Sequence, residues 1–600
     1  MYGYNGKILR INLSEKTVRA EPLDMKEAQK FIGGRGLGTK VMMDEVDPGV
    51  DALSPENKLI FVTGPLTGTN TPTGGRYMVV TKSPLTGTIA SSNSGGYWGA
   101  ELKFAGYDMI IIEGKADSPV YINIVDDNVE IKDASHIWGK VVSETTSALE
   151  KEHGEKVRVA TIGPAGENLS KMAAIINDRG RAAGRSGVGA VMGSKNLKAI
   201  AVKGSGKVGI ADNDKLKEVY SKCMKQIKEN GVTGQGLPAY GTAILVNIIN
   251  ENGVFPTNNF QGAAFDKAEE ISGETLAAKY MTKKDPCFRC PIACGRFCEV
   301  DDVKGSGPEY ETIWAFGSDC GVSSLPDIIK ANYWCNEIGI DTISTGATIA
   351  AAMELYEKGY IKKEDLDGGP ELKWGNNEAV VEWVKRMALP DGLGARMAQG
   401  SYRLCEMYGV PELSMTVKKQ ELPAYDPRGI QGHGLQYATS NRGGCHVRGY
   451  MISPEILGVP EKLDRFSLDG KPKWTKIFQD LTAAIDSVGL CLFTSFAMSA
   501  DDYANTYNAV CGTDLTGADF IQSGERIWNL EKMFNLKAGI SPSQDTLPKR
   551  LLKEPIPGGP SKGWVHKLGE LLPDYYKLRG WDTNGIPTAE KLKELGIDIK

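Results

Sequence analysis

The chain has 600 residues, so we expect about two to four domains rather than a single hydrophobic core. Hydrophobic residues make up 41% and charged residues 24%, and the net charge is -5. There is no basic stripe and no apolar run long enough to span a bilayer, which argues against a nucleic-acid-binding or membrane protein. The N-terminal segment lacks the apolar core of a signal peptide, so a cytoplasmic location is expected. In that compartment the 11 cysteines should bind metal or be buried rather than form disulfides.

The order of the predicted elements indicates an α+β fold. Runs rich in β-branched residues predict strands at Leu59–Thr63, Tyr77–Thr81, Met109–Glu113 and Val120–Val125. Helical periodicity follows at Asp214–Glu229, Asp327–Glu337 and Ile343–Lys358. We therefore expect a β-rich domain at residues 1–208 and two mainly helical domains at 209–415 and 416–600. The Pro- and Lys-rich tail from about residue 540 is expected to wrap the surface.

Glycine clusters mark three loops of the first domain, at residues 73–76, 93–96 and 181–189. Two of them carry arginine, whose planar fork matches phosphate oxygens, while glycine lets backbone N–H groups approach an anion. None is a Walker A loop, and each taken singly is more typical of a structural turn. Three in one domain favour a large phosphorylated cofactor.

A six-residue segment occurs twice, as Asn336–Asp341 and as Asp486–Cys491. Each copy closes a helical pattern, and Gly339 and Gly489 suit the left-handed position that ends a helix. Two such turns could hold two similar halves of a ligand. A chance likeness between two helix ends remains an alternative.

The triplet Cys287, Cys290 and Cys294 has the spacing C-x2-C-x3-C, which brings three thiolates together at little loop entropy. Cys491 follows the second helix-ending turn and is our choice of fourth ligand, ahead of Cys298. An iron–sulfur cluster is favoured, with zinc or plain burial as rivals. Zinc sites prefer two C-x2-C pairs, and only one is present.

Acid–base candidates are few, because the chain has only five histidines. His446 lies in a glycine-rich loop that also contains two arginines, whereas a surface histidine is the ordinary interpretation. Glu309 and Glu311 flank Tyr310, and one of them could act as a base. Carboxylates are also simply favoured at a helix N-terminus.

The combined motifs resemble the aldehyde:ferredoxin oxidoreductase family over essentially the whole chain. They include, in this order, SPENKLI, GPLTGT, PTGGRY, KSPLTG, NSGGY, GAELKFAGYD, IGPAGEN, RAAGR, VGAVMGSKNLKAI, GPEYE, DTISTG, ELPAYDPRG, NRGGCH and SVGLC. The resemblance implies a β-rich domain that holds a bis-pterin tungsten (or molybdenum) cofactor, capped by two helical domains. It further implies oxidation of an aldehyde, RCHO + H2O → RCOOH + 2H+ + 2e−, with ferredoxin or an Fe–S subunit as electron acceptor.

The resemblance also assigns roles to individual residues. Glu311 and His446 match the acid–base pair, and Cys287, Cys290, Cys294 and Cys491 match the ligands of one 4Fe-4S cluster. The backbones of Asn93 and Ala182 match the positions that hold Mg2+ between the pterin phosphates. The other implied pterin contacts are Arg76, Gly95, Arg181, Ala183, Gly184, Asn336, Ile340, Asp341, Arg448, Asp486 and Leu490.

Three positions depart from the family pattern. Asn336 replaces the usual Asp, and Arg448 replaces a Lys. Some relatives bridge two subunits through a metal held by an E-x-x-H pair, where this chain has Lys330-Ala331-Asn332-Tyr333. We therefore expect an oligomer without a bridging mononuclear iron. A relative acting on a sugar aldehyde or an aromatic ring, or a tungsten-free electron-transfer or scaffold protein, remains an alternative.

Overall fold

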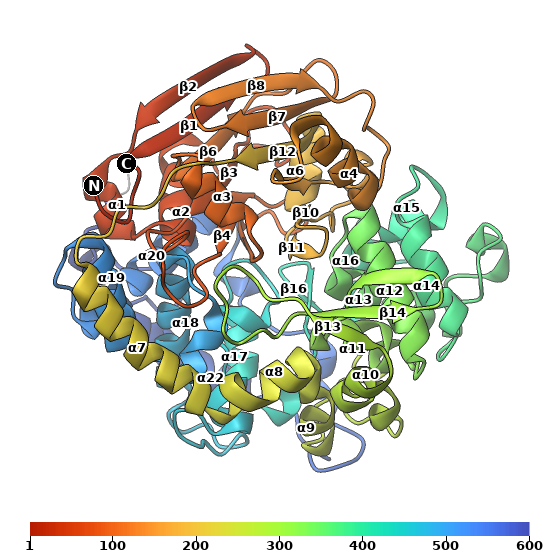
Figure 1. Cartoon of the computed structure of the whole chain (residues 1–600). Coiled ribbons are helices and arrows are strands. Elements are labelled where there is room, and N and C mark those ends of the chain that lie inside the picture. The colour runs from red at the N-terminus through yellow and green to blue at the C-terminus, as the bar shows by residue number, and fades with distance from the viewer. Residues whose placement is uncertain (599–600) are drawn as a thin grey trace.

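Two six-stranded sheets form the N-terminal part of the computed structural model, which describes residues 1–598 (Figure 1). The first sheet has the order β2-β1-β6-β3-β4-β5, with bounds Thr17–Pro22, Lys7–Asn12, Met109–Glu113, Leu59–Thr63, Tyr77–Lys82 and Ile89–Ser94. The second has the order β11-β10-β9-β12-β7-β8, with bounds Arg181–Ala183, Ile175–Asn177, Arg158–Thr161, Leu197–Lys203, Val120–Val125 and Asn128–Asp133. All four strands predicted from the sequence are confirmed.

Side chains of the first sheet alternate between two hydrophobic clusters. In β3, Phe61 points into a cluster with Trp98 and with Ile122 of the second sheet, so this cluster lies between the sheets. Ile60 and Val62 point to the opposite side, into a cluster shared with the helices that cover the sheet. Because successive strand residues face opposite sides, burial on both sides accounts for the apolar run from Leu59 to Val62 in β3.

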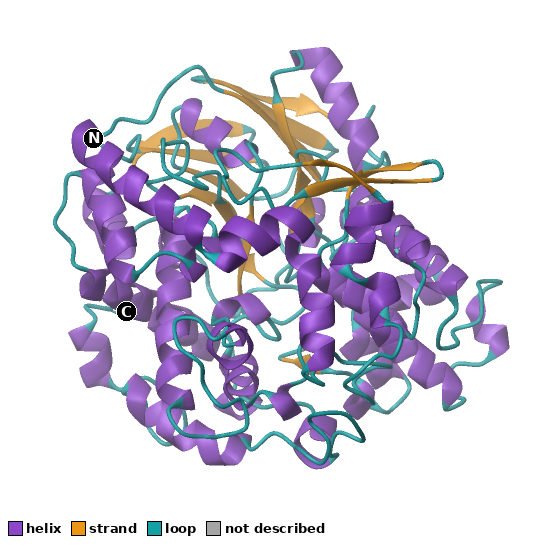
Figure 2. Ribbon diagram, turned by 60° about the horizontal axis from the view of Figure 1, so that its bottom comes forward, coloured by secondary structure: helices purple, strands orange, loops and turns teal. Residues whose placement is uncertain are grey.

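Helices dominate after residue 208 (Figure 2). The main ones are α7 (Asn213–Glu229), α11 (Tyr310–Phe316), α12 (Leu325–Ile338), α13 (Thr342–Glu357), α17 (Gln431–Thr439), α18 (Lys471–Val488), α19 (Ala500–Cys511), α20 (Gly517–Lys537) and α22 (Leu568–Arg579). The three predicted helices correspond to α7, α12 and α13. One large hydrophobic cluster includes Trp314 and Val384 as well as Tyr437 and Tyr575, so a single core extends across residue 415.

The predicted helix-ending turns are confirmed. Gly339 ends α12 at φ 72°, and Gly489 ends α18 at φ 93°. Each turn lies directly against a glycine of the β-rich part: a Cβ on Gly163 would be 2.4 Å from the carbonyl carbon of Ile338, and one on Gly64 would be 2.2 Å from that of Val488. The two helix ends are therefore anchored to the sheets by close backbone contact.

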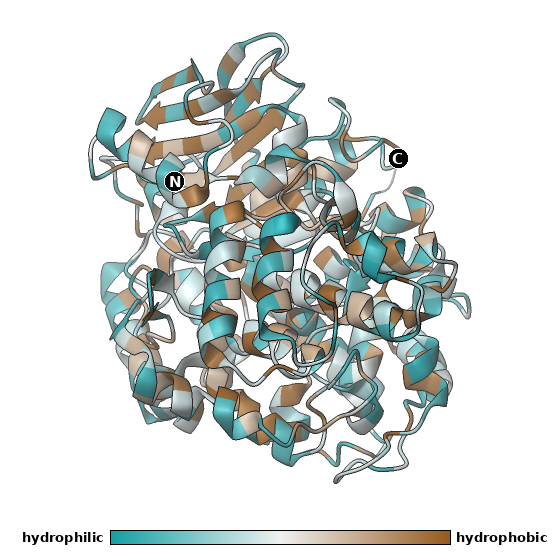
Figure 3. Ribbon diagram, turned by 90° about the vertical axis from the view of Figure 1, so that its right-hand side faces the viewer, coloured by the Kyte–Doolittle hydropathy of each residue, from teal (hydrophilic) through white to brown (hydrophobic). Residues whose placement is uncertain are grey.

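Two features differ from the sequence prediction. A three-stranded sheet, β13 (Met281–Lys284), β14 (Arg296–Val300) and β15 (Val303–Ser306), was not predicted, and the cysteine triplet occupies its first loop. The prediction that the tail wraps the surface is wrong for α22, because Tyr575 and Arg579 are fully buried against α18. An amphipathic helix with polar residues on its outer face explains the misleading composition; such two-sided helices are visible in Figure 3.

Within residues 1–598, no helix is both long and apolar enough to cross a membrane.

The crossing of α18 and α20 gives a stability prediction. A Cβ on Gly524 of α20 would lie 1.8 Å from the backbone oxygen of Asp480, and both atoms belong to packed helices. Gly524→Ala should therefore destabilise the protein by about 1–3 kcal/mol or more and lower its apparent melting temperature.

The matched control is Gly569→Ala at the exposed start of α22, where a Cβ would meet nothing within 4 Å. Alanine is the better helix former, by up to about 1 kcal/mol, so this variant should melt at the same temperature or higher. Equal melting temperatures of the two variants would contradict the tight crossing of α18 and α20.

Candidate active site

A cavity is lined by residues of the helical part, by β11, and by Arg76 and Gly95, which adjoin strands β4 and β5 of the first sheet. Its enclosed volume of about 380 Å³ lies within the roughly 300–1,000 Å³ typical of small-molecule sites. It brings together twelve of the residues singled out in the sequence: Arg76, Gly95, Arg181, Ala182, Gly184, Cys287, Cys294, Glu311, Asn336, Ile340, Asp341 and His446. The chain positions that form it are thus far apart in sequence and adjacent in space.

The remaining predicted residues lie behind this lining. Cys290 and Cys491 line an adjoining hollow, and Ala183, Arg448 and Leu490 are buried. Asn93 accepts a hydrogen bond from Arg76 through Oδ1 at 3.1 Å, and its Nδ2 lies 3.4 Å from Asp486 Oδ1. Arg76 and Asn93 therefore connect the cavity wall to the second of the repeated turns.

The four cysteines line one hollow together with Arg76. Arg76 Nη2 donates to Cys491 Sγ at 3.0 Å, and the Cys491 amide donates to Thr73 Oγ1 at 3.1 Å. Cys298, the rejected candidate, is buried in β14 and faces Gly307 instead. A hollow enclosed by four thiols and one guanidinium suits a multi-atom anionic cluster.

Glu311 and His446 face each other on the cavity wall. His446 Nε2 lies 3.6 Å from Glu311 Oε1, and Glu311 Oε2 accepts the Ala424 amide at 2.9 Å. Burial raises the pKa of Glu311 to about 8, although the Ala424 amide and Arg185 oppose this. Burial, with Arg185 as a further cause, lowers the pKa of His446 well below its usual range. Near neutral pH the pair is therefore a mostly protonated carboxyl beside a neutral imidazole.

Glu309, the other acid of this segment, has different surroundings. Its side chain is 43% exposed, and its Oε2 accepts a hydrogen bond from Thr242. It also lines the cavity, but it lies near Arg296 rather than His446. Exposure and position relative to His446 thus distinguish two carboxylates that sequence alone could not distinguish.

The first repeated turn ends in Asp341, which caps α13. Its carboxylate accepts the amides of Ile343 and Ser344, both at 3.2 Å. Arg185 Nε donates to Asp341 Oδ2 at 3.1 Å, and Arg185 Nη1 donates to the Gly444 carbonyl at 2.8 Å. Arg185, which sequence analysis did not single out, therefore connects this turn to the loop that carries His446.

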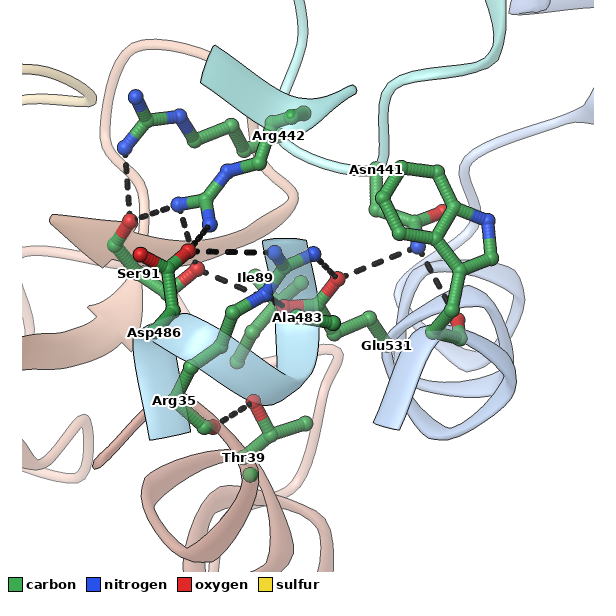
Figure 4. Close-up of polar contacts among 12 residues, drawn as sticks. Arg35, Thr39, Ile89, Ser91, Asn441, Arg442, Ala483, Asp486 and Glu531 are labelled. Atoms are coloured by element: carbon green, nitrogen blue, oxygen red, sulfur yellow. Dashed lines mark hydrogen bonds and ion pairs between the residues drawn. The ribbon is translucent and has the colours of Figure 1, made fainter. Parts of the chain in front are cut away.

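The second repeated turn is held by a buried charge network (Figure 4). Arg35 donates two hydrogen bonds of 2.7 Å to Glu531 and a third, of 3.3 Å, to Asp486. Arg448 Nη1 donates to the same carboxylate at 2.7 Å. Neither Arg35 nor Glu531 was recognised from sequence, because they lie 496 positions apart and belong to no motif.

Counting Arg442, the network has three guanidinium groups and two carboxylates. Arg442 Nη1 donates to the Ser91 carbonyl at 2.7 Å, and Arg448 donates to the same oxygen. The Nε atoms of Arg442 and Arg448 are buried and have no partner among the described residues. A surplus of positive charge with free donors is a surrounding suited to an anionic ligand.

The raised pKa of Glu311 predicts a pH-dependent stability difference. The folded protein binds this proton more tightly than the unfolded chain, so wild-type stability should fall as pH rises from about 4.5 to about 8. Glu311→Gln carries no titratable carboxyl, and its stability relative to wild type should increase by at most about 1.4 kcal/mol per pH unit in this window.

Denaturant unfolding at pH 5 and pH 8 measures this difference, with Glu309→Gln as the comparison for loss of a carboxylate at the same helix end. If the free energy of unfolding of Glu311→Gln relative to wild type does not increase between pH 5 and pH 8, the Glu311 carboxyl is not buried and neutral as described.

Comparison with known proteins gives matches over most of the chain. The family model described as "Aldehyde ferredoxin oxidoreductase, N-terminal domain" matches residues 8–204, and that described as "Aldehyde ferredoxin oxidoreductase, domains 2 & 3" matches residues 218–597. A tungsten-containing aldehyde ferredoxin oxidoreductase of Pyrococcus furiosus is 59% identical over 601 residues, covering 100% of this chain and 99% of that protein. One of the same description from Pyrococcus abyssi is 58% identical over 604 residues, covering 100% of both.

Among solved structures, the active-site complex BamBC of benzoyl coenzyme A reductase with 1,5-dienoyl-CoA is similar in fold. Its TM-score is 0.87 at 26% identity, and the match covers 99% of this chain and 97% of that chain. The resemblance stated from the sequence motifs is confirmed by these matches: the chain belongs to the aldehyde ferredoxin oxidoreductase family.

Proposed function

We propose that the protein oxidises aldehydes to carboxylic acids at a tungsten–pterin centre, with an iron–sulfur cluster as the exit for electrons and ferredoxin as their acceptor. The observation that carries this proposal is the buried Glu311–His446 pair, which shares one cavity with two arginine-bearing glycine loops and two of the four clustered cysteines. The 59% identity to a tungsten-containing aldehyde enzyme, against 26% to the benzoyl coenzyme A reductase complex, favours an aldehyde over an aromatic ring.

The residues present fit a large, doubly anionic cofactor. Arg76 and Arg181 line the cavity as cations, and Gly95 leaves no room for a side chain, since a Cβ there would be 2.9 Å from Cys287 Sγ. The buried, unpartnered Nε of Arg448 supplies a free donor beside the second turn. In our assignment the turns Asn336–Asp341 and Asp486–Leu490 hold one pterin each. Ala183 and Gly184 complete the cradle.

We further assign Mg2+ to the backbones of Asn93 and Ala182, and one 4Fe-4S cluster to Cys287, Cys290, Cys294 and Cys491. Asn93 is the next-to-last residue of β5, an edge strand of the first sheet, and Ala182 is the middle residue of β11, an edge strand of the second. An ion between these two positions would join the two sheet edges, which supports a shared site for two phosphates. Tungsten when bound supplies Lewis acidity and accepts two electrons, and the cluster passes electrons singly.

The side chains supply the proton chemistry. In its ionised form Glu311 accepts a proton from water or the aldehyde hydrate, and the Ala424 amide holds its carboxyl in place at 2.9 Å. His446, neutral by burial, donates a hydrogen bond to the substrate oxygen and relays the proton outward. Tyr425 and Tyr450 hydrogen-bond each other at 2.8 Å and line the same cavity, so they exclude water from the reacting carbon.

We place the enzyme in the cytoplasm, as an oligomer that lacks a bridging mononuclear iron. The segment in which some relatives carry the E-x-x-H pair has Lys330 paired with Asp301 at 2.7 Å and Asn332 donating to the Ser306 carbonyl at 2.8 Å. These side chains are already committed to contacts within the chain, which supports a different mode of assembly. A separate Fe–S subunit is compatible with the same arrangement.

Removing the base should lower turnover without removing the cofactor. Glu311→Gln is nearly isosteric but cannot accept the proton, so kcat for aldehyde oxidation should fall by about 10²-fold or more, with tungsten and iron contents unchanged. Glu309→Gln, which alters the half-exposed acid of the same segment, should stay within about twofold of wild type. A viologen-coupled assay under anaerobic conditions measures both. Equal rates for the two variants would remove Glu311 from this role.

The fourth cluster ligand can be tested by comparing two cysteines. Cys491→Ser should lower iron content and the visible absorbance of the cluster, and reduce dye-coupled turnover by about tenfold or more, because one of four thiolates is lost. Cys298→Ser changes the rival cysteine in β14, which lies outside the hollow, and should retain wild-type iron content. The reverse pattern would transfer the ligand role to Cys298.

A further inference from the structure

A second hollow lies beside the cysteine triplet. It measures about 800 Å³, including its open mouth, and we call it the cysteine-loop hollow. Its apolar lining comes from Phe104, Val208, Ile210 and Phe288, and its charged lining from Lys207 and Arg289. An apolar centre with charged residues at its edge is the usual composition of a protein-binding surface.

The hollow is formed in part by the cluster loop itself. Phe288 and Arg289 stand between Cys287 and Cys290, which are half-buried residues. The Phe288 amide donates to the Gly96 carbonyl at 3.1 Å, and the Thr73 amide donates to the Arg289 carbonyl at 3.0 Å. The loop is therefore fixed to the β-rich part, and a protein seated in the hollow would contact the residues that separate two cluster ligands.

Charge around this loop is positive and not neutralised. Lys207 and Arg289 are exposed, and neither belongs to an ion pair among residues 1–598. Exposed Lys283 and Lys284 precede the triplet on β13 and are likewise without ion pairs in that range. The one acid of this stretch, Asp285, is paired with Arg181 at 3.1 Å. In a chain of net charge -5, this is a local reversal of sign.

We propose that the cysteine-loop hollow is the docking site of an acidic, one-electron carrier protein; this rests on the proposed function, in which ferredoxin is the acceptor. The phenylalanines and aliphatic side chains bury an apolar patch of the carrier, and Lys207 and Arg289 pair with its carboxylates. The basic rim raises the association rate, which the net negative charge of the chain would otherwise depress.

The test uses the holoenzyme with a double charge reversal, Lys207→Glu with Arg289→Glu. For ferredoxin reduction by this variant, kcat/KM should fall at least tenfold at low salt, mainly through KM. The wild-type kcat/KM should decline as ionic strength rises, and this dependence should disappear in the variant. Benzyl viologen is small and cationic, so its reduction should be unchanged or faster. The cluster's electron paramagnetic resonance signal should also be unchanged, which excludes damage to the cysteine loop.

Lys577→Glu with Lys593→Glu is the matched control, since it makes the same change of charge at exposed lysines of the C-terminal helices that form no ion pair within residues 1–598. Its ferredoxin kinetics should equal those of wild type. If both double variants lower kcat/KM equally, or neither does, the docking site is wrong. If charge reversal changes the oligomeric state and leaves ferredoxin kinetics intact, the hollow holds a second copy of this chain instead. Wild type that reduces viologen but no ferredoxin would overturn the acceptor itself.

Discussion

The close approach of two helix ends to two glycines is the constraint on which the rest of the site depends. Gly64 and Gly163 lie so near the ends of α18 and α12 that a single methyl group would overlap backbone atoms. The contacts are reinforced by hydrogen bonds from the Leu66 amide to the Val488 carbonyl, 3.0 Å, and from the Ala174 amide to the Gly339 carbonyl, 2.8 Å. Backbone contacts of this kind allow almost no sliding, so the helical part and the sheets meet in one register. That register sets the shape of the cavity between the helical part and the sheets.

The same anchored turn is completed differently in its two copies. The first ends in Asp341, whose carboxylate caps α13 and pairs with Arg185. The second ends in Cys491, whose thiol accepts a hydrogen bond from Arg76 and lines the four-cysteine hollow. One residue at equivalent positions therefore decides whether a turn is closed by an ion pair or opened towards the four-cysteine hollow. Under the proposed function, a nearly repeated scaffold would in this way combine two-fold binding of a cofactor with a one-sided route for electrons.

Local signals made much of this fold predictable, and long-range contacts set the limit. The strand at Leu59–Thr63 and the glycine ends of α12 and α18 were predictable because period, composition and left-handed φ are properties of short segments. The bidentate pair of Arg35 and Glu531 was not predictable, since its members are 496 positions apart and belong to no motif. β13 to β15 are too short for a clear pattern. The choice between Glu309 and Glu311 also needed coordinates, because only exposure and the position of His446 separate them.

Burial without partners is the last indication that the cavity is built for a ligand. Glu311 Oε1 and His446 Nδ1 are buried and have no hydrogen-bond partner within residues 1–598. Each such atom costs about 1–3 kcal/mol, which a structure tolerates where another gain offsets it. Here the cost keeps the carboxyl mostly protonated, with a pKa that lets it exchange a proton near neutral pH, and keeps the imidazole neutral. A salt bridge between charged forms would satisfy both groups and remove that capacity. The 3.6 Å separation, longer than a hydrogen bond, instead leaves both groups available to a substrate at the proposed site.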